Sequence, residues 1–166
     1  VSSTWPRRPG EVPKTTLPVG ATMAIQYSID VPKCAGINHA DFSIDGRYAI
    51  FTCEFAGTVA KIDMVNRKVL GYTQVIQPGR PTQVVKGPDG RDETICTTWK
   101  GMPQDIRVSP DGKTWYIADM MSNGVYVVDG ERFAQIDYVK TSTGAHGLYP
   151  SRDGRKLYIA NRGSNK

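Results

Sequence analysis

The stretch from Pro103 to Met121, PQDIRVSPDGKTWYIADMM, has the pattern of a strand, a tight turn and a second strand. Ile106 and Val108 alternate with polar residues, as in a strand with one buried face. The SPDG run at 109–112 consists of residues that favour tight turns. The run at 114–118, TWYIA, is rich in aromatic and β-branched side chains, which favour a strand. The stretch therefore predicts an antiparallel hairpin.

The same order of elements occurs before and after this hairpin. Asp-Gly turns stand at 45–46, 111–112 and 153–154, and the last two are 42 residues apart. Short strands follow each turn at intervals typical of four-stranded antiparallel units. A repeat of this length with four strands is the signature of a β-propeller blade. We therefore predict an all-β fold of β-propeller blades, each an antiparallel repeat of about 42 residues.

The turns also predict how the chain is divided. The first two Asp-Gly turns are 66 residues apart, one repeat plus about one hairpin, and the excess carries its own turn at 88–90. We interpret the excess as an inserted hairpin, with a relic half-unit as the alternative. The predicted segments are an extended proline-rich arm at 1–20 and a repeat region at 21–166, which holds a first strand at 21–31, a blade at 37–75, the inserted hairpin at 77–101, a blade at 102–142 and a half blade at 145–166.

The predicted number of blades is small for a propeller. Closed propellers have about four to eight blades, whereas this sequence predicts two and a half. A blade that lacks a neighbour exposes an apolar face and sheet edges. We therefore expect an incomplete propeller, or one completed by association, and self-association through exposed blade edges.

Composition restricts the classes of partner. The net charge is +5, but Lys and Arg are scattered and most lie beside turns. A nucleic-acid-binding domain is expected to show a clustered basic stripe or a known motif, so no nucleic-acid partner is predicted. No apolar run reaches the roughly 18 residues that span a bilayer, so no membrane span is predicted.

Three cysteines, Cys34, Cys53 and Cys96, allow at most one internal disulfide and a free thiol. None belongs to a CxxC pair, which argues against a zinc site. Cys53 lies in an apolar strand and is expected to be a small buried residue. Cys34 and Cys96 both flank loops, which leaves a bridge between these two open.

The repeats resemble the YVTN-type family of β-propeller repeats. The second unit matches with SPDG at 109–112, YIAD at 116–119 and VVD at 127–129. The third matches with Asp153-Gly154 and LYIAN at 157–161, while the first is looser. Relatives of this repeat include bacterial extracytoplasmic and surface-layer proteins. The haem-binding propeller of cytochrome cd-type nitrite reductases and the propellers of quinoprotein dehydrogenases look similar. The resemblance implies a propeller fold and a periplasmic or secreted location.

His39 and His146 are the only two histidines, and each precedes the inner strand of a unit. Strand entries of a propeller face its central channel, where ligands commonly bind. Together with Gln104, Asp105 and Arg107, these histidines are the predicted ligand-binding residues. The alternative is a structural role, with each imidazole hydrogen-bonded to a neighbouring blade. Two histidines alone do not complete a metal site, so no metal site is predicted.

No catalytic motif is present, and the aspartates of the Asp-Gly turns are expected to cap their own turns. We therefore predict no catalytic residues and a non-catalytic, extracytoplasmic propeller that binds an unknown protein or small ligand without a cofactor. The alternative is a fragment of a haem- or metal-binding oxidoreductase propeller. A lactonase-like hydrolase is a third interpretation.

Overall fold

The computed structural model describes residues 27–87 and 90–165. The chain divides into two units, residues 1–30 and 31–166, and every strand described lies in the second unit. The predicted arm at 1–20 lies outside the described residues. Of the strand expected at 21–31, only residues 27–31 are described, and they do not form a strand.

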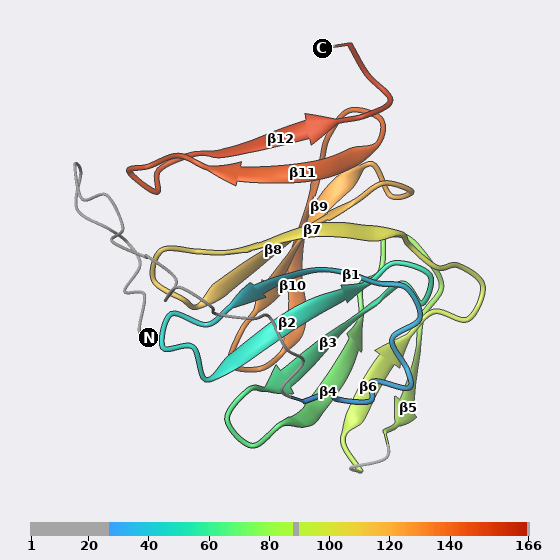
Figure 1. Ribbon diagram of the computed structural model, residues 1–166. Coiled ribbons are helices and arrows are strands. Elements are labelled where there is room, and N and C mark those ends of the chain that lie inside the picture. The colour runs from blue at the N-terminus through green and yellow to red at the C-terminus, as the bar shows by residue number, and fades with distance from the viewer. Residues whose placement is uncertain (1–26, 88–89, 166) are drawn as a thin grey trace, which may run out of the picture. The chain divides into compact units, whose positions relative to one another are not determined.

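The described residues form twelve antiparallel strands in four sheets (Figure 1). Strands β1 to β4 form one four-stranded sheet in chain order, β7 to β10 form a second, and β5–β6 and β11–β12 are two-stranded. These four-stranded units confirm the predicted all-β, propeller-type fold. The strands are β1 (Ile37–Phe42), β2 (Tyr48–Cys53), β3 (Thr58–Asp63), β4 (Lys68–Gln74), β5 (Gln83–Lys86), β6 (Asp92–Ile95), β7 (Pro103–Val108), β8 (Thr114–Asp119), β9 (Gly124–Asp129), β10 (Ala134–Lys140), β11 (Ala145–Pro150) and β12 (Leu157–Asn161).

The Asp-Gly turns are built alike in all three units. In the β1–β2 turn, Asp45 Oδ1 accepts hydrogen bonds from Ser43 Oγ at 2.7 Å and from the Arg47 backbone N–H at 3.1 Å. These bonds, the first above all, lower the pKa of Asp45. Gly46 has a φ of +70°, which suits glycine. The same side-chain bonds recur at 109–113 and 151–155, which confirms that these aspartates cap their turns.

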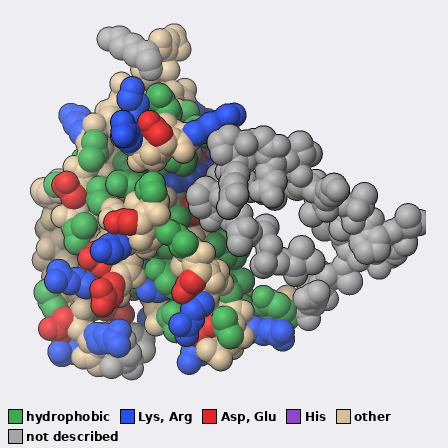
Figure 2. Space-filling view, turned by 90° about the vertical axis from the view of Figure 1, so that its left-hand side faces the viewer, with side chains coloured by type: hydrophobic (Ala, Val, Ile, Leu, Met, Phe, Trp, Pro, Cys, Tyr) green, Lys and Arg blue, Asp and Glu red, His purple; other side chains and the backbone are tan. Residues whose placement is uncertain are grey.

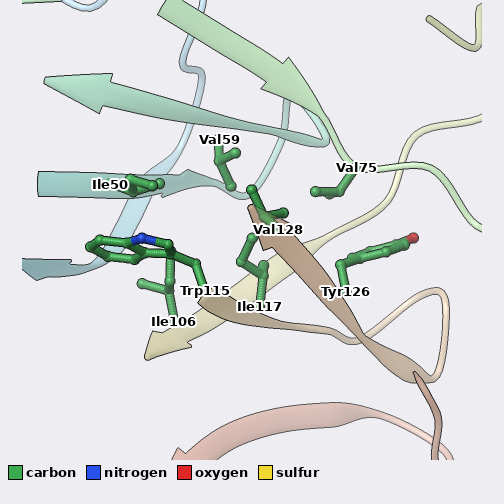
Figure 3. Close-up of a cluster of buried hydrophobic side chains, with 8 residues drawn as sticks. All are labelled: Ile50, Val59, Val75, Ile106, Trp115, Ile117, Tyr126 and Val128. Atoms are coloured by element: carbon green, nitrogen blue, oxygen red, sulfur yellow. The ribbon is translucent and has the colours of Figure 1, made fainter. Parts of the chain in front are cut away.

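Strand β8 is the centre of the packing because both of its faces are covered. Successive side chains of a strand point to opposite faces. Trp115 and Ile117 are fully buried against Ile50 and Val59 of the β1–β4 sheet (Figure 3). Ala118, on the opposite face, packs with Ala145 and Leu148 of β11, alongside Tyr116 from its own strand. The second blade is thus held between its two neighbours, as stacked blades require.

The surface mixes both signs of charge. On the face drawn in Figure 2, basic, acidic and hydrophobic side chains of the described residues are interspersed. None of the described residues forms a helix that is long and apolar enough to cross a membrane.

The disulfide differs from the bridge that the sequence left open. Cys34 is bonded to Cys53, while Cys96 is a buried free thiol. The loop before β1 folds back along the end of β2, where the Glu54 N–H donates to the Gly36 carbonyl at 2.8 Å. This pairing brings the Cα atoms of Cys34 and Cys53 to 4.8 Å, within the range that a disulfide requires.

Removing this disulfide is expected to lower the free energy of unfolding. The bridge joins residues 19 positions apart, and closing such a loop in the unfolded chain stabilises the native state by roughly 3 kcal/mol. The double variant Cys34→Ala/Cys53→Ala should lose about this amount in urea denaturation. Reduced wild-type protein should match the variant, and Cys96→Ala serves as the control that keeps the bridge. Equal stability of the oxidised wild type and the double variant would contradict the assignment.

Candidate functional site at the strand entries

The inner strands β1, β7 and β11 begin at equivalent positions in their sheets. Ile37, Pro103 and Ala145 pair with the last residues of β2, β8 and β12. An irregularity in the pairing follows at once in each strand. Such bulges redirect side chains and are common beside functional sites. The second residues of the three strands are Asn38, Gln104 and His146, and the third residues are His39, Asp105 and Gly147.

Both histidines and Asp105 come together at these entries. The rings of His39 and His146 meet edge to face, with centroids 6.2 Å apart. His39 Nδ1 lies 3.6 Å from Asp105 Oδ1, an ion-pair distance when the imidazole is protonated. The His39 side chain is 38% exposed, whereas that of Asp105 is only 4% exposed. The site therefore combines an accessible imidazole with a buried carboxylate.

Asp105 is fixed by bonds to the neighbouring strand β11 and to its own strand β7. Its Oδ2 accepts the Leu148 N–H of β11 at 2.8 Å, and its Oδ1 accepts the Ile106 N–H at 2.9 Å. Arg107 Nη1 lies 2.7 Å from the same Oδ1 and balances its charge. The Asp105 carboxylate therefore has a fixed position close to the His39 imidazole.

Gln104, the remaining predicted site residue, belongs to a polar network beside this group. Its side chain, almost fully buried, accepts a bond from Asn38 Nδ2 at 3.0 Å and donates to Glu54 Oε1 at 3.0 Å. Asn38 also donates to Glu54 Oε2 at 3.3 Å. Asn38 and Glu54 were not among the residues predicted from the sequence. The equivalence of Asn38 with Gln104 and His146 is the signal that could have found Asn38.

His146 is kept neutral by its surroundings. Burial lowers its pKa, and the charges of Arg162 and His39 lower it further, against the opposing effect of Asp105. Because the proton is bound more weakly in the folded than in the unfolded protein, stability falls as the pH is lowered below about 6.5. At near-neutral pH, His146 is therefore an uncharged neighbour of His39.

An NMR titration of the histidine rings checks this environment. His146 is expected to titrate below pH 6.5, and Arg162→Met should raise its midpoint, because one repelling charge is removed. Arg155→Ala, which changes an exposed arginine of the β11–β12 turn, is the matched control and should leave the midpoint unchanged. A midpoint above 6.5 in the wild type would contradict the burial described here.

The described residues contain no group of three or more His, Cys, Asp or Glu side chains arranged to hold a metal ion. His39, His146 and Asp105 together offer a base, a neutral imidazole and a fixed carboxylate. This set suits acid–base chemistry on a small ligand.

The sequence matches no protein-family model and no curated protein. Solved structures with a similar fold are propellers. The periplasmic gluconolactonase of Pseudomonas aeruginosa matches with a TM-score of 0.62 and 20% identity over 82% of this chain and 36% of its own. A candidate 6-phosphogluconolactonase from Bacteroides fragilis matches with a TM-score of 0.55 and 22% identity over 80% of this chain and 33% of its own. The WD40 repeats of RRP9 match with a TM-score of 0.53 and 14% identity over 74% of this chain and 32% of their own.

These similarities establish the propeller-type fold, and this chain spans about a third of the length of the structures that it resembles. They also correct the functional prediction. Two of the structures described above carry lactonase names, which contradicts the prediction of a non-catalytic binding protein. They do not favour the haem- or metal-binding oxidoreductase either. The five predicted site residues remain a prediction, now with a defined geometry.

Proposed function

We propose that the chain contributes the strand-entry site of a lactone hydrolase, which opens a cyclic ester of a sugar acid with water. The observation that carries the proposal is the contact between accessible His39 and buried Asp105. Hydrolysis of an ester needs a general base to activate water, and histidine is the side chain used most often. The similarity to two propellers with lactonase names supports the choice of ester.

The proposed reaction needs only the chain's own residues and water. His39 accepts a proton from a water molecule, whose oxygen attacks the carbonyl carbon of the lactone. The buried carboxylate of Asp105 then stabilises the imidazolium that forms. The bond between the carbonyl carbon and the ring oxygen breaks, and His39 returns the proton to that oxygen. The product is an open-chain hydroxy acid.

Two further residues have proposed roles beside His39. Neutral His146 lies against the His39 ring and adds no competing positive charge. Arg162 is exposed, and its charge acts on His146. We assign to Arg162 the stabilisation of the negative charge that develops on the carbonyl oxygen. Arg107 is ion-paired with Asp105, and we therefore assign it as a positioning residue.

The experiment that tests the proposal is ring opening of D-glucono-1,5-lactone by the purified chain. Proton release is followed at pH 6.5, and the rate is compared with spontaneous opening in the same buffer. The proposal predicts saturable acceleration that scales with protein concentration. A rate equal to the spontaneous one, for this lactone and for a five-membered sugar lactone, would overturn it.

The finer sequence-based interpretations are kept as part of this proposal. We assign the repeats to the YVTN type and place the protein outside the cytoplasm. The disulfide is compatible with an oxidising compartment, and one similar structure is a periplasmic enzyme. The proposed reaction uses no cofactor.

A further inference from the structure

A groove with a cavity volume of about 690 Å³ lies away from the strand entries, and none of the predicted site residues lines it. It runs between β4 of the first blade, β6 of the inserted hairpin and the start of β10. Its volume is within the usual range of ligand pockets, which is about 300–1,000 Å³. The groove is therefore large enough for a second ligand.

One wall of the groove is the free edge of β4. The Val75 N–H donates to the Gly57 carbonyl on the β3 side. Successive residues of an antiparallel strand direct their backbone groups to opposite sides. The N–H and C=O groups of Tyr72 and Gln74 therefore face away from β3 and into the groove. β4 ends its sheet, so these groups have no strand partner among the described residues.

The opposite wall is the free edge of β6. The Gly87 N–H donates to the Arg91 carbonyl on the β5 side. By the same alternation, the backbone groups of Asp92 and Thr94 face away from β5. At one end the two walls converge, because the Gln74 side chain bonds both the N–H and the carbonyl of Cys96. Two unpaired strand edges thus line one groove, which suits an extended segment of roughly four residues.

Basic residues outnumber acidic residues in the lining of the groove, and contacts hold the guanidinium group of Arg80 in place. Four Lys and Arg residues line it, against two acidic residues. The Arg80 guanidinium lies 5.0 Å from the centroid of the Trp99 ring and donates to Gln77 Oε1 at 3.0 and 3.2 Å. No carboxylate of the described residues lies within ion-pair distance of Arg80. Asp92, by contrast, is paired with Lys86 of β5.

We propose that this groove binds an extended acidic peptide segment of a partner protein, which adds a strand between β4 and β6. The backbone edges supply hydrogen bonds to the main chain of the peptide. Arg80, already positioned by Trp99 and Gln77, bonds a carboxylate of the peptide. The groove is a second site, separate from the proposed hydrolytic one, and its proposed role does not depend on the hydrolytic activity.

Fluorescence anisotropy with a labelled peptide of alternating Glu and Val, eight residues long, tests the proposal. We expect saturable binding that weakens with salt, and Arg80→Ala should raise the dissociation constant roughly 10- to 100-fold. Arg155→Ala, outside the groove, is the matched control and should bind like the wild type. The same peptide with Lys in place of Glu should not bind.

Two further measurements distinguish strand addition from charge attraction alone and from self-association. The acidic peptide N-methylated at alternate residues keeps its charge but loses one hydrogen-bonding edge, and it should bind at least tenfold more weakly. Equal binding of the methylated peptide, or no binding of the unmethylated one, would overturn the proposal. A dimer of the chain alone that disappears on Arg80→Ala would assign the groove to a second copy and would overturn the proposal as well.

Discussion

Replacing Trp115 with alanine is expected to lower the free energy of unfolding by about 4 kcal/mol, because large-to-small changes of buried aromatic residues cost about 3–5 kcal/mol. The Trp115 side chain is fully buried in the cluster that joins the two four-stranded sheets. Its ring packs at a tilt against the ring of Tyr48 of the first blade, with centroids 5.8 Å apart. Its loss therefore removes contacts within the second blade and between the blades.

Denaturation in urea, followed by far-UV circular dichroism, measures this loss. Typical domains are stable by about 5–15 kcal/mol. A loss of about 4 kcal/mol is therefore close to the whole stability of a domain at the lower end of this range, and a second variant that stays folded is needed. Trp115→Phe, which keeps an aromatic ring in the cluster, should cost about 1–2 kcal/mol and stay folded. Ile136→Ala, at an exposed position of β10, is the control. Similar stabilities for Trp115→Phe, Ile136→Ala and the wild type would contradict the central place of Trp115.

Replacing His39 with glutamine is expected to lower the catalytic rate for lactone opening roughly 10³-fold, the scale of a lost general base. Glutamine has a polar side chain that cannot accept a proton at neutral pH. Because the His39 side chain is 38% exposed, the change should barely affect folding. His146→Gln should have a smaller effect, because this ring only borders the proposed base.

The sequence was sufficient for the fold because the turns carry local signals. Asp45, Asp111 and Asp153 each bond a serine two residues earlier, so that the turn is specified within five residues. Trp115 and Tyr116 are adjacent in β8 and pack on its two opposite faces, as the alternation of side chains along a strand requires. The pairing of Cys34 with Cys53 was not predictable in this way, because it depends on how a loop folds back along β2.

The candidate site was only partly visible in the sequence. Each inner strand contributes one or two residues, so that no local motif marks the site. His39 contacts Asp105 only because two blades pack side by side, and Asp105 is held by Leu148 of a third. The histidines stood out because they are rare in the chain, whereas Glu54 had no such signal. The erroneous prediction of a non-catalytic protein followed from this absence of a motif.

The rate of D-glucono-1,5-lactone opening by the wild type, His39→Gln and Arg155→Ala, measured side by side at equal protein concentration, tests the proposed function most directly. We predict that the wild type and Arg155→Ala accelerate the reaction equally and that His39→Gln is reduced roughly 10³-fold. Equal rates for His39→Gln and the wild type, with both variants folded, would contradict the assignment of the reaction to the strand-entry site.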